Sequence, residues 1–191
     1  GGEQLGGMLD AMDAWATDGT APPDSQIPSR ADGTLVNYDE WRQQFPVIPG
    51  VAIPRDINQL AHMDFGQLFD SGVLTEPPRV LKEEGYVTQV PSVDADGNDL
   101  AGVRVPMVQA PLGTYTGWNL RQRGKGTGSM HLFTGSYIPL PNDEFERKGT
   151  QDPRPSILER YRTSTAYVAT IRAAAEQLVD ARLMLAEDIE R

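Results

Sequence analysis

The sequence contains no cysteine, and this absence excludes several kinds of site at once. Disulfides, thiolate catalysis and cysteine-ligated zinc all require a thiol. Only two histidines are present among 191 residues, so a histidine-rich metal site is excluded as well. Because cysteine-free chains occur in both reducing and oxidising compartments, the composition leaves the localisation open.

The chain also lacks a long apolar run and an excess of positive charge. No segment approaches the ~20 apolar residues that span a bilayer, and no charged stretch followed by an apolar one opens the chain as a signal peptide would. Seventeen basic against 27 acidic residues give a formal charge of -10, which disfavours phosphate backbones and anionic lipid. We therefore expect a soluble protein that binds neither nucleic acid nor membrane. Export directed by a signal on a longer precursor stays open.

A third absence is the nucleophile motif Gly-x-Ser-x-Gly of α/β-type serine hydrolases. The segment Gly126-Thr-Gly-Ser-Met130 places Ser129 at the wrong position, and His131 follows it without a carboxylate to orient the ring. Gly124–Ser129 has the composition of a phosphate loop but not its spacing. The residues alone therefore predict no catalytic side chain and no cofactor.

What the sequence has in abundance is glycine and proline, 19 and 15 residues, which indicates many turns. We treat residues 1–191 as a single region. The periodicity and the turn signals predict five segments in chain order: a helix over 1–19, an irregular strap with short helices over 20–84, a β-hairpin over 85–110, glycine-rich loops over 111–155, and a helix over 156–189. The expected fold class is thus α+β and loop-rich, with a long C-terminal helix.

That helix is the best-defined segment. Ser156 stands at the N-cap position and Glu159 three residues later, which is the capping-box pattern. Apolar residues then follow a 3.6-residue period from Ile157 to Leu185.

The predicted hairpin turn contains Asp94, Asp96 and Asn98 at every second position, an arrangement that begins some calcium loops. The match then fails, because Gly97 takes the fourth position and Val105 stands where the bidentate glutamate belongs. A turn that uses Asp, Gly and Asn for left-handed backbone angles explains the same residues. These three residues are therefore only weak calcium candidates.

A second segment combines aromatic rings, hydroxyls, an amide and a guanidinium on a glycine-flanked stretch. Such a mixture lines pockets for oxygen-rich small molecules, and it also anchors buried interfaces. The candidates for a substrate pocket or a docking surface are Tyr115, Thr116, Trp118, Asn119 and Arg121.

Several segments, in order and over nearly the whole chain, resemble the C-terminal portion of a family of large bacterial α/β-hydrolase domain proteins of the serine-hydrolase type. The segments are Leu9–Pro28, Asp32–Val36, Phe45–Gly50, Asp94–Arg104, Gly113–Arg121, Gly135–Pro139 and Asp152–Tyr161. In that family the nucleophile precedes this portion, so the resemblance assigns no catalytic residue here. It implies acyl transfer on an ester or related bond, carried out with an α/β-hydrolase core in cis or in trans, and it makes this chain part of an α/β-hydrolase fold.

A different interpretation is an independent module that binds a ligand or a partner through the Tyr115–Arg121 segment and has no catalytic activity. Whether the chain is a truncation, a processed subunit or a stand-alone domain stays open, as do the substrate and the oligomeric state.

Overall fold

The computed structural model describes residues 2–81, 85–122, 124–131 and 133–190. Its helices are α1 (Gly2–Asp18), α2 (Tyr38–Gln44), α3 (Pro106–Gln109), α4 (Glu144–Thr150), α5 (Ile157–Tyr161) and α6 (Ser164–Asp180), with 3₁₀ turns η1 (Phe69–Ser71) and η2 (Ala186–Asp188). Its strands are β1 (Leu35–Asn37), β2 (Met63–Asp64), β3 (Arg79–Val80), β4 (Gln89–Pro91), β5 (Gly113–Thr116), β6 (Asn119–Leu120), β7 (Met130–His131) and β8 (Ser136–Pro139). In the described ranges these pair as four antiparallel two-stranded sheets, which confirms the loop-rich α+β class. The parts of the predicted strap at 82–84 and of the predicted loops at 123 and 132 lie outside the described residues.

Helix α2 organises the first hydrophobic core. It begins at a capping box in which the Asn37 side chain accepts a bond from the Glu40 N–H at 2.9 Å and Glu40 accepts one from the Asn37 N–H at 2.9 Å. The helix presents Trp41 to the interior and packs beside β1, which pairs with β4. The buried members of this core are Val36, Trp41, Phe45, Ile48 and Val93.

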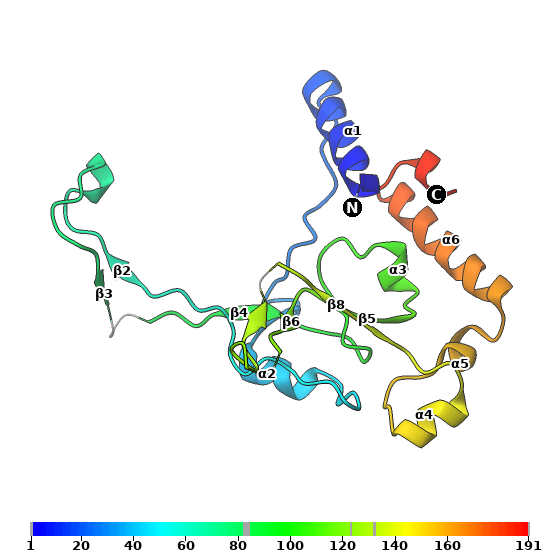
Figure 1. Ribbon diagram of the computed structural model, residues 1–191. Helices are drawn as coiled ribbons and strands as arrows, with labels where there is room; N and C mark the ends of the chain where they lie inside the picture. Colours follow the sequence, from blue (N-terminus) through cyan, green and yellow to red (C-terminus); the bar gives the residue numbers. More distant parts are fainter. Residues whose placement is uncertain (1, 82–84, 123, 132, 191) are drawn as a thin grey trace.

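The β5–β8 pair forms the centre of the body, with β6–β7 nested between its two strands in the chain (Figure 1). Two glycines permit the close approach of its strands. A Cβ on Gly113 would lie 2.6 Å from the Ile138 carbonyl oxygen, and one on Gly135 would collide with the Thr116 carbonyl oxygen. Side chains at these two positions would force the strands apart, so the pairing depends on glycine there.

The predicted hairpin over 85–110 is present only at its tip. A bridge between Val93 and Asp99 closes the turn, and Gly97 adopts a φ of 80°. On the N-terminal side, however, β4 pairs with β1, and on the C-terminal side residues Pro106–Gln109 form α3. Proline has no N–H to donate to a ladder and is well suited to the first position of a helix, so the predicted second strand ends before it.

The long C-terminal helix is confirmed, but over a shorter span than 156–189. The capping box of Ser156 and Glu159 begins α5 as predicted. The helix then breaks at Arg162, whose φ is 61°, and restarts as α6, where the Thr163 hydroxyl accepts a bond from the Ala166 N–H at 3.1 Å. A threonine that caps the backbone competes with helix continuation, and the 3.6-residue period does not reveal this competition.

Helix α6 packs on α3 and ends in a second core of Ala175, Leu178 and Met184. Helix α1 lies beside the chain that follows α6 (Figure 1). A Cβ on Gly7 would lie 2.9 Å from the Leu183 carbonyl carbon, and Arg182 donates a bond to the Ala21 carbonyl at 2.9 Å. Gly19, with a φ of 69°, follows the end of α1 close to the predicted boundary.

The strap contains more structure than the prediction specified. Residues 21–28 are extended, as the prolines require, but α2 and the strand pairs follow. The β2–β3 pair, with η1 at its tip, projects away from the body as an arm (Figure 1). Among the described residues, no helix is long and apolar enough to cross a bilayer.

Candidate ligand-binding pocket

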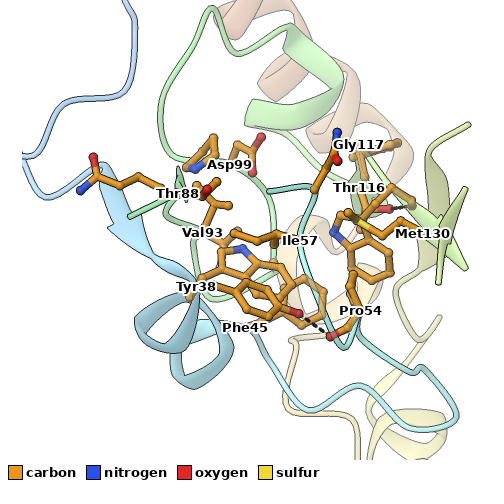
Figure 2. A pocket seen from close by; sticks show the side chains of 18 of the residues that line it. Tyr38, Phe45, Pro54, Ile57, Thr88, Val93, Asp99, Thr116, Gly117 and Met130 are labelled. Atoms are coloured by element: carbon orange, nitrogen blue, oxygen red, sulfur yellow. Dashed lines mark hydrogen bonds between the residues drawn. The ribbon is translucent and has the colours of Figure 1, made fainter. Parts of the chain in front are cut away.

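A cavity of about 380 Å³ lies between α2 and the segment that runs from β5 into β6 (Figure 2). One wall is aromatic. The Tyr38 ring stacks on Trp41 with centroids 5.6 Å apart, and Phe45 lies 4.9 Å from Trp41. Trp118 continues this wall, with its centroid 5.9 Å from Phe45 and 6.2 Å from Trp41. A cavity of this size with mainly apolar walls is suited to a small organic molecule.

Two polar groups of the pocket have no hydrogen-bond partner within the described residues. The Thr88 hydroxyl is buried, and the Asp99 carboxyl accepts no hydrogen bond and forms no ion pair there. Partial desolvation of the carboxyl by surrounding atoms raises the pKa of Asp99, the charge of Arg104 lowers it and that of Asp94 raises it, with a net upward shift. In the view of Figure 2, Thr88, Val93 and Asp99 lie on one side and Thr116 and Met130 on the other. A buried hydroxyl is normally paired, so the Thr88 hydroxyl is available to a ligand. Asp99 lines the cavity from an exposed position and places a carboxyl at its edge.

The structure brings together three of the five residues predicted for a pocket or docking surface. Tyr115, Thr116 and Trp118 line the cavity. Thr116 is held in place because its hydroxyl donates to the Trp118 carbonyl at 2.6 Å. Asn119 and Arg121 do not line the cavity. Asn119 lies in β6, where its side-chain oxygen accepts a bond from the Leu120 N–H at 2.7 Å, and the Arg121 N–H donates to the Ser129 carbonyl at 2.9 Å.

His131, two residues after Ser129, also lines the cavity. Its Nδ1 lies 2.9 Å from the Thr134 hydroxyl. Ser129 is not among the lining residues, and its N–H donates to the Gly126 carbonyl at 3.0 Å. These contacts join Ser129 to a tight turn and give it no base.

The three weak calcium candidates form hydrogen bonds and ion pairs within the turn and to the segments beside it. Asp94 accepts bonds from two backbone N–H groups, those of residues 96 and 98, and pairs with Arg104 at 2.6 Å. Asp96 pairs with Arg160. Asn98 is fully buried; its amide donates to the Gly113 carbonyl at 3.2 Å and its oxygen accepts from the Tyr115 N–H at 2.7 Å. The geometry therefore favours the turn over calcium, and the described residues contain no cluster suited to a metal ion.

A buried polar centre positions the pocket wall from behind. Arg154 is 1% exposed and binds both carboxylate oxygens of Asp152, at 3.0 and 2.7 Å. Its guanidinium also donates to the Thr114 hydroxyl at 2.9 Å and to the carbonyls of Ile138 and Pro139 at 3.0 and 2.9 Å. Thr114 in turn donates to the Asp96 carbonyl. One side chain thus connects the C-terminal segment, the β5–β8 pair and the acidic turn.

Glu159 is expected to make stability depend on acid pH. Hydrogen bonds from Arg147 and then from Ser156 lower its pKa to about 2, from 4.5. A carboxyl whose pKa is depressed on folding stabilises the protein fully above the unfolded value and loses that contribution as the pH falls through the folded value. Wild type should therefore melt higher than Glu159→Gln at neutral pH, and this difference should disappear between about pH 4.5 and 2.

Thermal melts across this pH range test the expectation. Glu144→Gln is the control, because Glu144 pairs with Lys148 on the surface, where both side chains are more than half exposed. Surface pairs contribute little, so this variant should follow wild type. A difference for Glu159→Gln that stays constant with pH would contradict the expectation.

Sequence reasoning missed the α2 wall and the two unpartnered groups. The wall was detectable, because Asn37 and Glu40 form a capping-box pattern and Tyr38, Trp41 and Phe45 recur at helical spacing. Thr88 and Asp99 carry no comparable signal. Both residues reach the pocket through tertiary structure. β4, which follows Thr88, pairs with β1, and the turn that contains Asp99 is closed by its bridge to Val93.

Comparisons with known proteins add one finding to this geometry. Neither the curated proteins nor the solved structures provide a match to the chain. A protein family described as "Alpha/beta hydrolase domain" matches residues 5–191. This match covers all but the first four residues, and the chain therefore belongs to the alpha/beta hydrolase domain family.

Proposed function

We propose that this chain is the C-terminal, non-nucleophile part of a serine hydrolase that acts on an ester or related bond. Family membership supports the hydrolase assignment. The sequence contains no Gly-x-Ser-x-Gly, and in the described ranges the strands form only two-stranded antiparallel sheets. The nucleophile and the parallel sheet that presents it would then come from an α/β-hydrolase core, in cis or in trans.

The apolar face of α1 is the observation that carries this proposal. Five residues at the spacing of a core-facing stripe are each more than half exposed: Leu5, Met8, Leu9, Met12 and Trp15. An amphipathic helix normally buries such a stripe, and a contiguous exposed one marks an interaction surface. Beside it, residues 22–28 and Leu183 border an apolar groove. A hydrolase core packed on this surface would bury both the stripe and the groove.

The test is the intact mass, under denaturing conditions, of the native protein after reaction with a fluorophosphonate serine probe. The proposal expects the probe on a longer polypeptide that includes this sequence, or on a companion that copurifies with it. An unlabelled 20.9 kDa species alone, with no labelled companion, would overturn the proposal. A labelled 20.9 kDa chain would overturn the assignment of the nucleophile to a separate core.

A second candidate function is an independent ligand-binding module, and the pocket favours it. The cavity combines aromatic walls with the Asp99 carboxyl and with a Thr88 hydroxyl that has no partner among the described residues. This function expects the isolated 191-residue chain to be monodisperse and to unfold in one cooperative transition. The hydrolase-fragment function instead expects the isolated chain to associate and to bind hydrophobic dyes through α1.

A further inference from the structure

The charged side chains around the pocket determine whether a cationic or an anionic ligand can bind there. Among the described lining residues there is no lysine or arginine; Asp99 is the only acid and His131 the only ionisable nitrogen base. A ligand carboxylate or phosphate would therefore enter an apolar cavity without a cationic partner, which is strongly unfavourable. The formal charge of -10 adds a long-range attraction for cations.

Within the described residues, the negative charge of Asp99 has no ion-pair partner. The guanidinium that lowers its pKa, that of Arg104, pairs with Asp94 at 2.6 Å and also donates to the Val108 carbonyl at 3.2 Å. Two acids and one base in this group leave one net negative charge, which lies at the pocket. Two further guanidinium groups lie near the pocket but outside the lining set. Arg42 lies 5.9 Å from the centroid of the Tyr38 ring, and Arg55 borders the neighbouring hollow together with the acid Asp56.

The aromatic wall also favours a positively charged ligand. Ring faces are electronegative and attract ammonium groups that come within about 6 Å. Tyr38, Trp41, Phe45 and Trp118 provide four such rings along one cavity. The Thr88 hydroxyl, buried and without a partner in the described residues, is an additional acceptor for an N–H donor.

We infer that this pocket binds a small organic cation, an ammonium group attached to one apolar or aromatic body, with the charged end at Asp99 and Thr88 and the body against the rings of α2 and Trp118. The inference rests on the second candidate function, ligand binding, and names the ligand class for it. It is independent of a serine nucleophile.

Three probes with the same phenyl body and polar ends of different charge test the preference on the 191-residue chain. They are 2-phenylethylammonium, 2-phenylethanol and phenylacetate, titrated by calorimetry and by ligand-observed NMR at neutral pH. The ammonium ion is expected to bind at least about tenfold more tightly than the alcohol, which corresponds to one charge-assisted hydrogen bond. Phenylacetate is expected to bind most weakly. Tighter binding of phenylacetate, or equal binding of all three, would overturn the inference.

The variant Asp99→Asn assigns the preference to one residue. It should bring the ammonium ion to within about twofold of the alcohol and leave alcohol binding unchanged, since the amide keeps the shape and removes only the charge. Asp70→Asn, which removes an exposed acid from η1 on the arm, is the matched control and should behave as wild type. An ammonium preference that survives Asp99→Asn would refute the assigned role.

The outcomes separate this inference from the function on which it rests. If ammonium ion and alcohol bind equally and phenylacetate does not bind, ligand binding stands and the cation preference is wrong. If none of the three binds at millimolar concentration, both are wrong. The ranking on the wild-type chain decides the question even if Asp99→Asn fails to fold, and a thermal melt of the variant detects that failure.

Discussion

Asp152→Ala is expected to lower the free energy of unfolding by about 3–5 kcal/mol, the usual cost of removing one partner of a buried ion pair. Arg154 would keep its charge at 1% exposure but retain only one hydroxyl and two carbonyls as acceptors. Burial alone would raise the pKa of Asp152, yet hydrogen bonds from Arg154 and its charge lower it below the usual value. Since folded domains are stable by only about 5–15 kcal/mol, the variant should lose a large share of its stability.

Urea denaturation followed by circular dichroism measures this effect. Asp70→Ala on the arm is the matched control and should stay within about 0.5 kcal/mol of wild type. The double variant Asp152→Ala/Arg154→Ala completes a thermodynamic cycle. Its loss of unfolding free energy should be much smaller than the sum of the losses in the two single variants. Additive effects would contradict the assignment of the pair as the connection between the C-terminal segment and the β5–β8 pair.

Trp41→Ala is expected to cost about 3–5 kcal/mol, because it leaves a cavity in the first core and removes the centre of the pocket wall. Trp41 is 6% exposed and its ring contacts Tyr38, Phe45 and Trp118. The variant should also weaken binding of aromatic probes by the pocket, since the ring that contacts the other three rings of the wall is gone. Chemical denaturation and probe titration measure the two effects separately.

Trp15→Ala is the control for this variant, because it removes the same side chain from a position that is 59% exposed. In the isolated chain it should cost well under 1 kcal/mol. Equal costs for the two variants would mean that the α2 cluster is not a core. In a longer polypeptide with a hydrolase core packed on α1, Trp15→Ala should become destabilising, so the same pair of variants also tests the proposed assembly.

Local features were predictable where the deciding interaction lies within one turn of the chain. The capping box at Ser156, the end of α1 before Gly19 and the turn at Gly97 all follow from side-chain and backbone chemistry over a few residues. Features that depend on a partner distant in sequence were not predictable. β4 pairs with a strand more than fifty residues earlier, and a threonine ended the helix that the apolar period continued.

For the candidate site, the sequence by itself determined the chemistry that is excluded and the segment that supplies part of the wall. Without cysteine or a nucleophile motif, this chain cannot supply thiolate chemistry or a serine elbow, and Tyr115, Thr116 and Trp118 were identifiable from their composition. Only the tertiary structure placed the α2 rings beside Trp118 and brought Thr88 and Asp99 to the same cavity. The physical reason is that residue type decides what a side chain can do, whereas desolvation and the balance of charge depend on what the fold places around it.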